Sequence, residues 1–197
     1  MAISLIYGPT GSGKTKRLVK AYILAGRYNL KTIIIKPNVL YEEYDPYRIQ
    51  YDGITIKENL FVLGIDKIPL DEKYSFVLVE DVHLFSIPEV HIVLENFFPI
   101  SNNITFYGLL KDFANREFET TAYLLKNSKN LLDNVEELKT KCTVCGKHVA
   151  RNTQRLINKV PAPITTPQIF LNKFVEHYPT CDKCYVGPDK LVEEVNV

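Results

Sequence analysis

Residues 8 to 15 of this chain match the pattern G-x-x-x-x-G-K-[ST] in full. In this pattern, glycines let backbone N–H groups curl around phosphate oxygens, the lysine reaches the outer phosphates and the final hydroxyl binds Mg²⁺. An apolar run before the motif and helical spacing after it supply the strand–loop–helix context, which disfavours an ordinary glycine-rich turn. We therefore predict an ATP and Mg²⁺ site formed by Gly8, Pro9, Thr10, Gly11, Ser12, Gly13, Lys14 and Thr15.

Two carboxylates follow the most strand-like run of the chain. Residues 74–79 read Tyr-Ser-Phe-Val-Leu-Val, and Glu80 and Asp81 come directly after them. Ligands of open parallel sheets bind at the carboxyl ends of the strands, so both acids are expected to face the triphosphate. One can hold Mg²⁺, usually through water, and the other can orient an attacking hydroxyl or accept its proton. The alternative is that one of them makes a local cap or ion pair.

All four cysteines fall into C-x-x-C pairs, namely Cys142 with Cys145 and Cys181 with Cys184. Two such turns can present four thiolates to one ion, in a tetrahedral site suited to structural Zn²⁺. About 35 residues separate the pairs, against a common spacing of roughly 15 to 20, so we expect a long loop clamped at its base. Disulfides are the alternative. His148 and His177 are close enough in sequence to replace a cysteine but are expected to be bystanders.

The elements that must position these groups alternate between strands and helices. Apolar runs predict strands at 3–7, 32–35, 60–63, 74–79 and 104–107, and helical spacing predicts helices at 17–25 and 88–97. This alternation favours an α/β fold with a parallel sheet and right-handed connections. Residues 41–53 carry four tyrosines among charges, and are expected to form a mobile loop or to pack against a neighbouring subunit.

The character of the sequence changes near residue 140, where prolines and the cysteine pairs gather. We predict a nucleotide-binding domain over 1–139, a zinc-binding domain over 140–190 and a tail over 191–197, with fraying from 187. The formal net charge of +1 shows no bulk demand for nucleic acid or an anionic membrane. The longest apolar runs fall short of the roughly 20 residues that cross a bilayer, and no cleavable signal is evident. The predicted location is cytoplasmic.

These blocks, taken in order, resemble the type II, zinc-containing thymidine kinases. The phosphate loop, the acidic pair, the segment 108–118, the first cysteine pair, Thr153-x-Arg155 and the second cysteine pair follow the family order across nearly the whole chain. The resemblance implies a P-loop parallel-sheet core with a small C-terminal zinc-binding lasso over the base. It also implies transfer of the γ-phosphate of ATP to the 5′-hydroxyl of thymidine or a related pyrimidine deoxynucleoside, with Mg²⁺, structural Zn²⁺ and a homotetramer.

The resemblance assigns roles to individual residues. Lys14, Glu80 and Asp81 take catalytic positions, with Thr15 and Glu80 on the Mg²⁺ side and Asp81 in the column of the general base. Lys36 begins the Lys-Pro that follows the second strand. The positions that line the nucleoside pocket correspond to Leu84, Leu109, Phe113, Phe118, Thr153 and Tyr178, the last approximating a lasso tyrosine near the base.

The chain departs from the family pattern around the base. Where the family usually reads Asp-Glu-Ala-Gln-Phe, residues 80–84 read Glu-Asp-Val-His-Leu. The acids are exchanged, and because aspartate reaches less far, Glu80 stays open as the alternative base. Thr10 stands where a methionine is frequent, and the lasso sequence Ile-Gly-Gly is absent from residues 171–178. These changes predict an altered pocket and make a modified pyrimidine deoxynucleoside a candidate acceptor.

Two other functions are compatible with the same motifs. The exchanged acids and the missing lasso glycines also fit a nucleotide-binding or regulatory protein with reduced kinase turnover. A small P-loop ATPase whose zinc knob grips a nucleic acid is the third hypothesis. It is disfavoured because the sequence has no basic stripe interleaved with aromatic residues.

Overall fold

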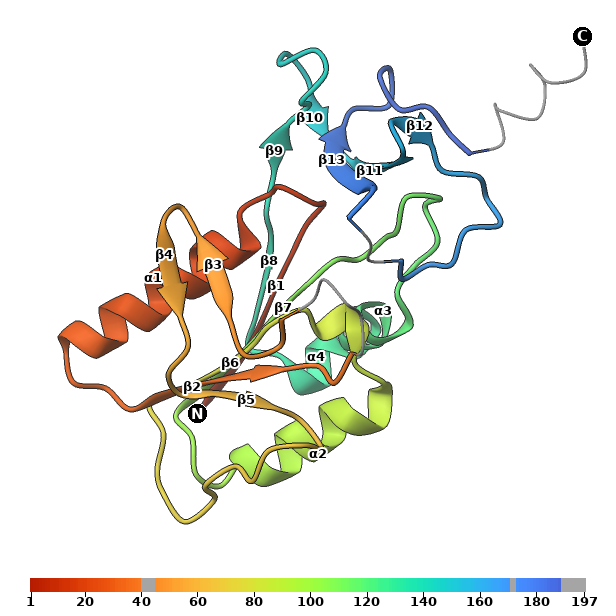
Figure 1. Cartoon of the computed structure of the whole chain (residues 1–197). Helices are drawn as coiled ribbons and strands as arrows, with labels where there is room; N and C mark the ends of the chain where they lie inside the picture. The colour runs from red at the N-terminus through yellow and green to blue at the C-terminus, as the bar shows by residue number, and fades with distance from the viewer. Residues whose placement is uncertain (40–44, 171–172, 189–197) are drawn as a thin grey trace, which may run out of the picture.

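The core of the molecule is a parallel sheet in the order β5-β2-β6-β7-β1-β8 (Figure 1). The computed structural model describes residues 1–39, 45–170 and 173–188. The six strands are β1 (Ala2–Tyr7), β2 (Thr32–Lys36), β5 (Leu60–Val62), β6 (Phe76–Val79), β7 (Asn103–Gly108) and β8 (Asn134–Glu137). The predicted α/β fold and its five predicted strands are confirmed. Strand β8, at the edge of the sheet, was not predicted.

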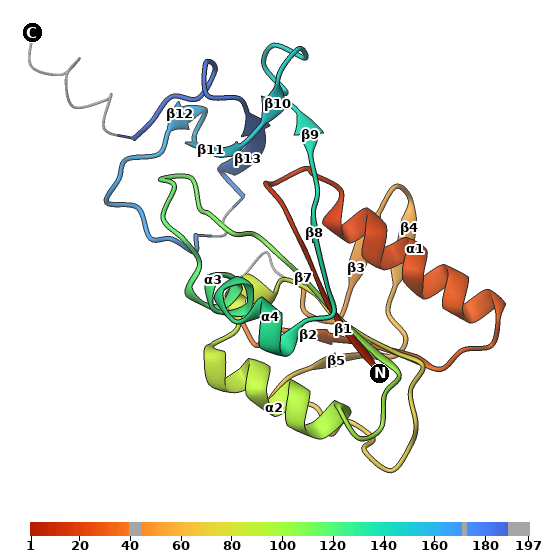
Figure 2. The same ribbon diagram turned by 180° about the vertical axis from the view of Figure 1, so that it is seen from behind.

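Both faces of the sheet are covered, which explains why its strands are apolar throughout. On β2, Ile33 and Ile35 pack in one hydrophobic cluster while Ile34 packs in the other, on the opposite face. Helix α1 contributes to the second cluster, and α2 and α3 contribute to the first (Figure 2). The helices are α1 (Lys14–Arg27), α2 (Ile87–Phe97), α3 (Glu119–Lys126) and α4 (Ser128–Leu131), with a 3₁₀ turn η1 (Val82–Leu84).

Part of the tyrosine-rich segment folds into a hairpin, which corrects the expectation of a mobile loop. Strands β3 (Ile49–Tyr51) and β4 (Ile54–Ile56) pair antiparallel, and Ile49 and Ile56 are buried in the cluster with α1. Asp52 and Gly53 connect them with φ of 49° and 77°, the left-handed backbone of a two-residue hairpin turn. The Asp-Gly dipeptide between alternating apolar residues was the available signal. Residues 40–44 lie outside the described part of the chain.

Strands near both ends of the segment between the cysteine pairs form a small antiparallel sheet, which the sequence analysis did not predict. The expected loop is confined to its middle, where the described residues 162–170 and 173–174 contain no strand. Six residues of β11 pair with six of β13, and β12 adds a third strand. A shorter pair, β9 with β10, carries the first cysteine turn. The bounds are β9 (Thr140–Lys141), β10 (Val149–Ala150), β11 (Asn152–Ile157), β12 (Val160–Pro161) and β13 (Val175–Thr180).

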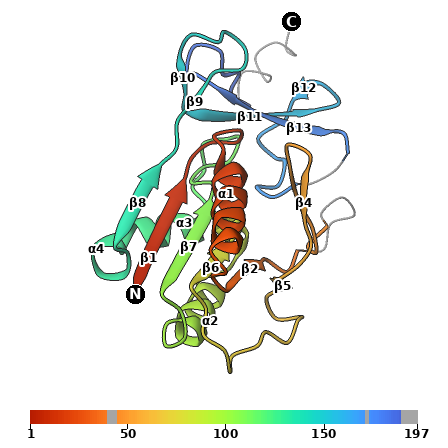
Figure 3. The same ribbon diagram turned by 90° about the vertical axis from the view of Figure 1, so that its left-hand side faces the viewer.

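These five short strands lie beyond the carboxyl ends of the parallel sheet, at the end where β1 meets α1 (Figure 3). Backbone and side-chain contacts join them to the phosphate loop. The N–H of Thr10 donates to Oγ1 of Thr153 at 3.3 Å, and a Cβ on Gly11 would lie 3.2 Å from the ring of Pro179. The predicted domain boundaries remain predictions, and the predicted tail lies outside the described residues. No helix in the described ranges is long and apolar enough to span a membrane.

Candidate active site

The predicted phosphate loop connects β1 to α1, as its motif requires. Gly11 and Gly13 have φ of 72° and 93°, in the left-handed region that side chains disfavour. Lys14, the first residue of α1, donates from Nζ to the carbonyl oxygens of Gly8 and Pro9, both at 2.9 Å. Burial lowers the pKa of the Lys14 ammonium to about 8, and the charge of Asp81 opposes that shift. The lysine therefore lies inside its own loop, beside the second acid.

The two acids at the end of β6 have different surroundings. Glu80 is 6% exposed, and its Oε2 lies 3.3 Å from Nζ of buried Lys36. Among the described residues, no donor is aligned for a hydrogen bond to that oxygen. Burial, with the charge of Asp81, raises the pKa of Glu80 to about 7 against the opposing effects of Lys36 and of a hydrogen bond from Thr15. Asp81 is half-buried, with φ of 52° and ψ of 44°.

A cavity of about 310 Å³ joins the phosphate loop to the second acid and to the C-terminal strands. The loop contributes Lys14 and Thr15, and η1 with its preceding residue contributes Asp81 and His83. The segment 168–170, between β12 and β13, lines the same cavity. Cavities of about 420 and 680 Å³ lie elsewhere, but neither brings Lys14 together with a carboxylate from β6. The chemistry predicted from the sequence therefore converges on this smaller cavity.

Arg155 of β11 ties the 168–170 segment to the strands below it. Its guanidinium donates to the carbonyl oxygens of Pro167 and Gln168 at 2.6 and 2.7 Å, and to Nε2 of His177 at 2.8 Å. The same group lies over the ring of Phe113, 4.2 Å from its centroid. Although it is an arginine, its residue is 4% exposed. It acts as a buried pin for the wall of the cavity.

The four cysteines form a second cluster, away from the cavity. Their sulfur atoms all lie within 4.8 Å of one another, and Sγ of Cys145 is 3.9 Å from Sγ of Cys181. A regular tetrahedron with Zn–S bonds of about 2.3 Å has edges of about 3.8 Å, so the cluster has the dimensions of a zinc site. All four cysteines are free thiols, so the disulfide alternative is not observed. The cluster contains neither His148 nor His177.

A family model described as thymidine kinase matches residues 1–185. The chain belongs to the thymidine kinase family. It is 31% identical over 194 residues to the thymidine kinase of Pyrobaculum aerophilum, with 93% of this chain and 98% of that protein covered. It is 28% identical over 201 residues to that of Thermococcus kodakarensis, with 95% of each covered. Against the thymidine kinase of Onion yellows phytoplasma, the identity is 27% over 195 residues, with 95% and 89% covered.

Two of the pocket residues implied by the thymidine kinase resemblance, Leu84 and Leu109, line the cavity directly. Phe118 packs behind it, edge-to-face against His83 with ring centroids 4.7 Å apart. Phe113 is buried under Arg155 and supports the wall without lining it. These two aromatic residues therefore support the cavity from outside without lining it.

The other two implied residues lie elsewhere. Thr153 lines the 420 Å³ cavity together with Gly8 and Pro9 of the phosphate loop, and its hydroxyl accepts from the Thr10 N–H. Tyr178 does not line the 310 Å³ cavity, whereas its neighbour His177 does. His177 pairs with Arg155 across β11 and β13, and Tyr178 pairs with Gln154. Since successive strand residues point to opposite faces, a one-residue shift exchanges them.

Three contributors to this cavity were not predicted from the sequence, namely His177, the anchoring role of Arg155, and the segment 168–170. The available signal for His177 was the alternation of side-chain directions along β13. This alternation places His177 on the same face of the strand as the residues two positions away. Arg155 belonged to a recognised motif, but its contacts with the carbonyl groups of residues 167 and 168 depend on where the chain returns after β12. No local sequence pattern predicts the path of the chain after β12.

Proposed function

We propose that this chain transfers the γ-phosphate of ATP to the 5′-hydroxyl of thymidine or a related pyrimidine deoxynucleoside. The observation that carries the proposal is one cavity lined at once by Lys14 and Thr15 of the phosphate loop, by Asp81, and by the 168–170 segment. The membership in the thymidine kinase family supports the same reaction. In it, the hydroxyl oxygen bonds to the γ-phosphorus, the bond to the bridging oxygen breaks, and ADP leaves.

The different surroundings of the two acids support different roles. Asp81 lines the cavity, so we assign it the proton of the attacking hydroxyl. Glu80 is buried beside Thr15, and its Oε2 has no aligned donor among the described residues. An oxygen in this state fits a Mg²⁺-bound water, so Thr15 and Glu80 would hold the Mg²⁺ side of ATP. Bound Mg²⁺ would neutralise charge on the phosphate oxygens.

The four thiols fit structural Zn²⁺ by number, type and spacing. Such a site would hold β9 and β10 against β13, close to the contacts with the phosphate loop. The homotetrameric assembly, the cytoplasmic location and the absence of a nucleic-acid partner remain predictions from the sequence and the resemblance. The alternatives are a regulatory protein and a nucleic-acid-dependent ATPase. The nucleoside panel described next separates both of them from a kinase.

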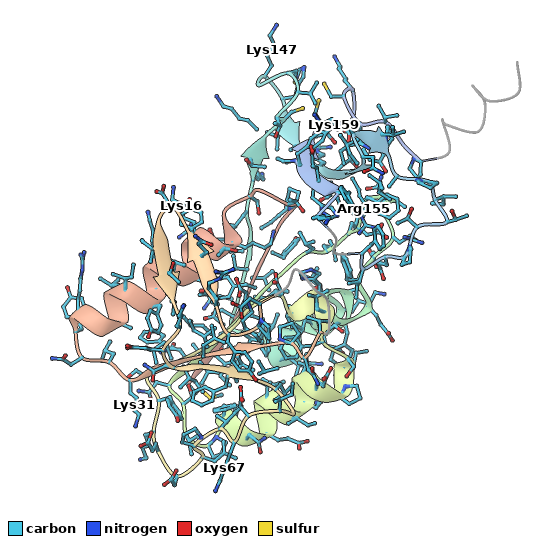
Figure 4. All side chains as sticks on the ribbon, in the orientation of Figure 1. Lys16, Lys31, Lys67, Lys147, Arg155 and Lys159 are labelled. Atoms are coloured by element: carbon cyan, nitrogen blue, oxygen red, sulfur yellow. The ribbon has the colours of Figure 1, made fainter. Side chains whose placement is uncertain are left out.

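The test is a nucleoside panel with purified protein, ATP and Mg²⁺, in which nucleoside monophosphate and ADP are both quantified. We expect equal amounts of the two products with thymidine or a related pyrimidine deoxynucleoside. Lys14→Ala should abolish turnover, because the phosphates lose their cationic partner. Lys67→Ala is the matched control, since Lys67 is exposed at the opposite end of the molecule from Arg155 (Figure 4).

Three outcomes would contradict the proposal. ATP binding without any nucleoside product would favour the regulatory protein. ADP formation that DNA or RNA stimulates and nucleosides do not would favour the ATPase. Full turnover in Lys14→Ala would show that the phosphate-loop lysine is not needed for the reaction.

A further inference from the structure

The register of two neighbouring strands brings Lys36 and Glu80 side by side. Strands β2 and β6 pair parallel, with Ile35 opposite Val79 as their last partners, and Lys36 and Glu80 are the next residues of the two strands' chains. The Glu80 N–H donates to the carbonyl oxygen of Ile35 at 2.9 Å, and Nζ of Lys36 lies 3.3 Å from Oε2 of Glu80. Only 3% of Lys36 is exposed. The ion pair is therefore buried at the carboxyl end of the sheet, where ligands of parallel sheets bind.

Two main-chain oxygens share the ammonium group with the carboxylate. Nζ of Lys36 donates to the carbonyl oxygen of Asp45 at 3.4 Å and to that of Arg48 at 3.1 Å. An ammonium group has three N–H donors and no acceptor. A buried charge is costly unless it is both paired and hydrogen-bonded. The carboxylate supplies the opposite charge here and the two carbonyl groups supply hydrogen bonds, which explains how a lysine can be buried at this place.

The segment 45–48 that carries these carbonyl groups has anchors of its own. The Tyr47 N–H donates to Oδ1 of Asp45 at 2.9 Å, and the Tyr47 hydroxyl donates to Oδ1 of Asp66 at 3.3 Å. The segment leads directly into β3, where Ile49 is buried in the cluster with α1. The oxygens that hold the Lys36 ammonium are therefore fixed by contacts that do not involve Glu80.

This arrangement leaves Glu80 neutralised by a cation but still able to accept a hydrogen bond. Thr15 of the phosphate loop donates to the carboxylate. The Lys36 ammonium is close to Oε2, yet no donor among the described residues is aligned for a hydrogen bond to that oxygen. A carboxylate oxygen in this state can accept a hydrogen bond from a Mg²⁺-bound water.

We propose that Lys36 is a positioning residue that holds Glu80 for the Mg²⁺ side of the proposed reaction, with the carbonyl groups of residues 45 and 48 fixing its ammonium. The inference rests on the proposed function and deepens it by adding a residue to its machinery. Lys14 lines the 310 Å³ cavity and Lys36 does not. Lys36 therefore acts through Glu80, whereas Lys14 can meet the phosphates directly.

The kinetic test uses Lys36→Met, which keeps most of the side-chain length and removes the charge. The Mg²⁺ concentration for half-maximal rate should rise about tenfold, equivalent to about 1.4 kcal/mol. KM for the nucleoside should change little, because the acceptor wall is untouched. Lys31→Met is the matched control, since Lys31 precedes β2 and pairs with Glu72 at the surface (Figure 4).

A double variant tests whether Lys36 acts through Glu80. In a Glu80→Gln background, Lys36→Met should add little to the Mg²⁺ requirement, because the partner that it positions is already lost. The double variant should also have a higher Tm than Lys36→Met alone, since it leaves no buried carboxylate without a cation. Lys36→Gln, which keeps N–H donors for the two carbonyl groups, replaces Lys36→Met if the latter does not fold.

A binding measurement does not depend on turnover. Calorimetry without nucleoside gives the affinity for ATP in excess Mg²⁺ and in EDTA. Mg²⁺ should strengthen ATP binding in the wild type and equally in Lys31→Met. In Lys36→Met this strengthening should be about tenfold smaller, again equivalent to about 1.4 kcal/mol.

The outcomes separate this inference from the proposed function. A wild-type chain that phosphorylates no nucleoside contradicts the function, while the binding measurement still tests Lys36. A lower Tm in Lys36→Met with wild-type Mg²⁺ dependence would show that the lysine serves the fold alone, and would overturn the inference. Additive effects of the two substitutions on the Mg²⁺ requirement would also overturn it, because Lys36 would then not act through Glu80.

Discussion

At the residue scale, the backbone of Asp81 offers a reason for the exchanged acids. Asp81 has a left-handed conformation with φ of 52°, which aspartate and asparagine adopt more readily than other residues with a Cβ. The conformation begins the η1 turn and carries the side chain into the cavity. Glu80, one residue earlier, directly follows the buried strand β6 and forms an ion pair with Lys36. Aspartate, the shorter acid, thus lies where the chain turns, and glutamate, the longer acid, lies where its side chain is buried.

This arrangement predicts different consequences for the two acids. Asp81→Asn should lower kcat by about 10² to 10⁴, the usual contribution of a general base, with little change in the Mg²⁺ requirement. Glu80→Gln should instead raise the Mg²⁺ concentration needed for half-maximal rate. Mg²⁺ titrations of initial rate measure both effects, with exposed Glu95→Gln as the control. The reverse pattern would make Glu80 the base.

At the element scale, the C-terminal strands position a wall of the cavity rather than merely covering it. Strands β11 and β13 pair over six residues, which sets Arg155 opposite His177. From there the guanidinium holds the carbonyl oxygens of Pro167 and Gln168, the residues that lead into the lining segment. The side chain of Gln168 also donates to the carbonyl oxygens of Arg116 and Glu117 at 3.4 and 3.1 Å. The wall is therefore tied at both sides.

Loss of the Arg155 guanidinium should weaken binding of the nucleoside more than binding of ATP. In Arg155→Met, two carbonyl groups and one imidazole lose a charged donor, so the wall should loosen. We expect KM for the nucleoside to rise about tenfold or more, with a smaller change in KM for ATP. Steady-state kinetics with each substrate varied in turn provide the measurement.

The control for this prediction is Arg151→Met, because Arg151 is exposed and lies 4.0 Å from Asp182 in a surface ion pair. Such pairs contribute little. An equal rise of both KM values in Arg155→Met, or a fall in kcat alone, would show that Arg155 does not act through the acceptor wall.

At the scale of the whole molecule, a series of direct contacts connects the cysteine cluster to the phosphate loop. The first cysteine turn meets β13 where the Thr143 N–H donates to the carbonyl oxygen of Pro179 at 2.9 Å. The ring of Pro179 in turn lies against Gly11, and Thr153 accepts from the loop at Thr10. A change at the thiols can therefore reach the triphosphate site through a short path of direct contacts.

Metal removal should accordingly affect both ends of that path. The chain as purified should contain about one zinc per subunit by elemental analysis. Chelation or Cys145→Ser should lower stability by about 3 kcal/mol, or roughly 10 °C in Tm, because binding energy at a structural zinc site is also folding energy. Hydrogen exchange should rise first in residues 140–188 and in the phosphate loop, while β2, β6 and β7 stay protected. Uniform exchange across the chain, or a zinc-free stable protein, would contradict this.

The amino-acid sequence determined the parts of this protein that depend on short stretches of chain. The phosphate loop, the acids after β6 and the two cysteine turns each lie within a dozen residues, and their geometry follows from local backbone preferences. Five buried strands were predictable because burial on both faces makes them apolar. Strand β8 was not, because Asn134–Glu137 is exposed along its length and has no apolar run. The hairpin at 49–56 had a local signal in Asp52-Gly53 that outweighed the tyrosine-rich composition.

Tertiary structure decided which side chains line the cavity beside the phosphate loop. The choice between His177 and Tyr178 depends on the register of β11 against β13, and a shift of one residue would exchange their faces. The role of Arg155 depends on carbonyl groups 12 and 13 residues further along the chain. Register and chain return are set by packing and long-range hydrogen bonds, whose energy comes from many residues at once. No short pattern of residue types encodes them, so the lining of this cavity could be found only in the folded molecule.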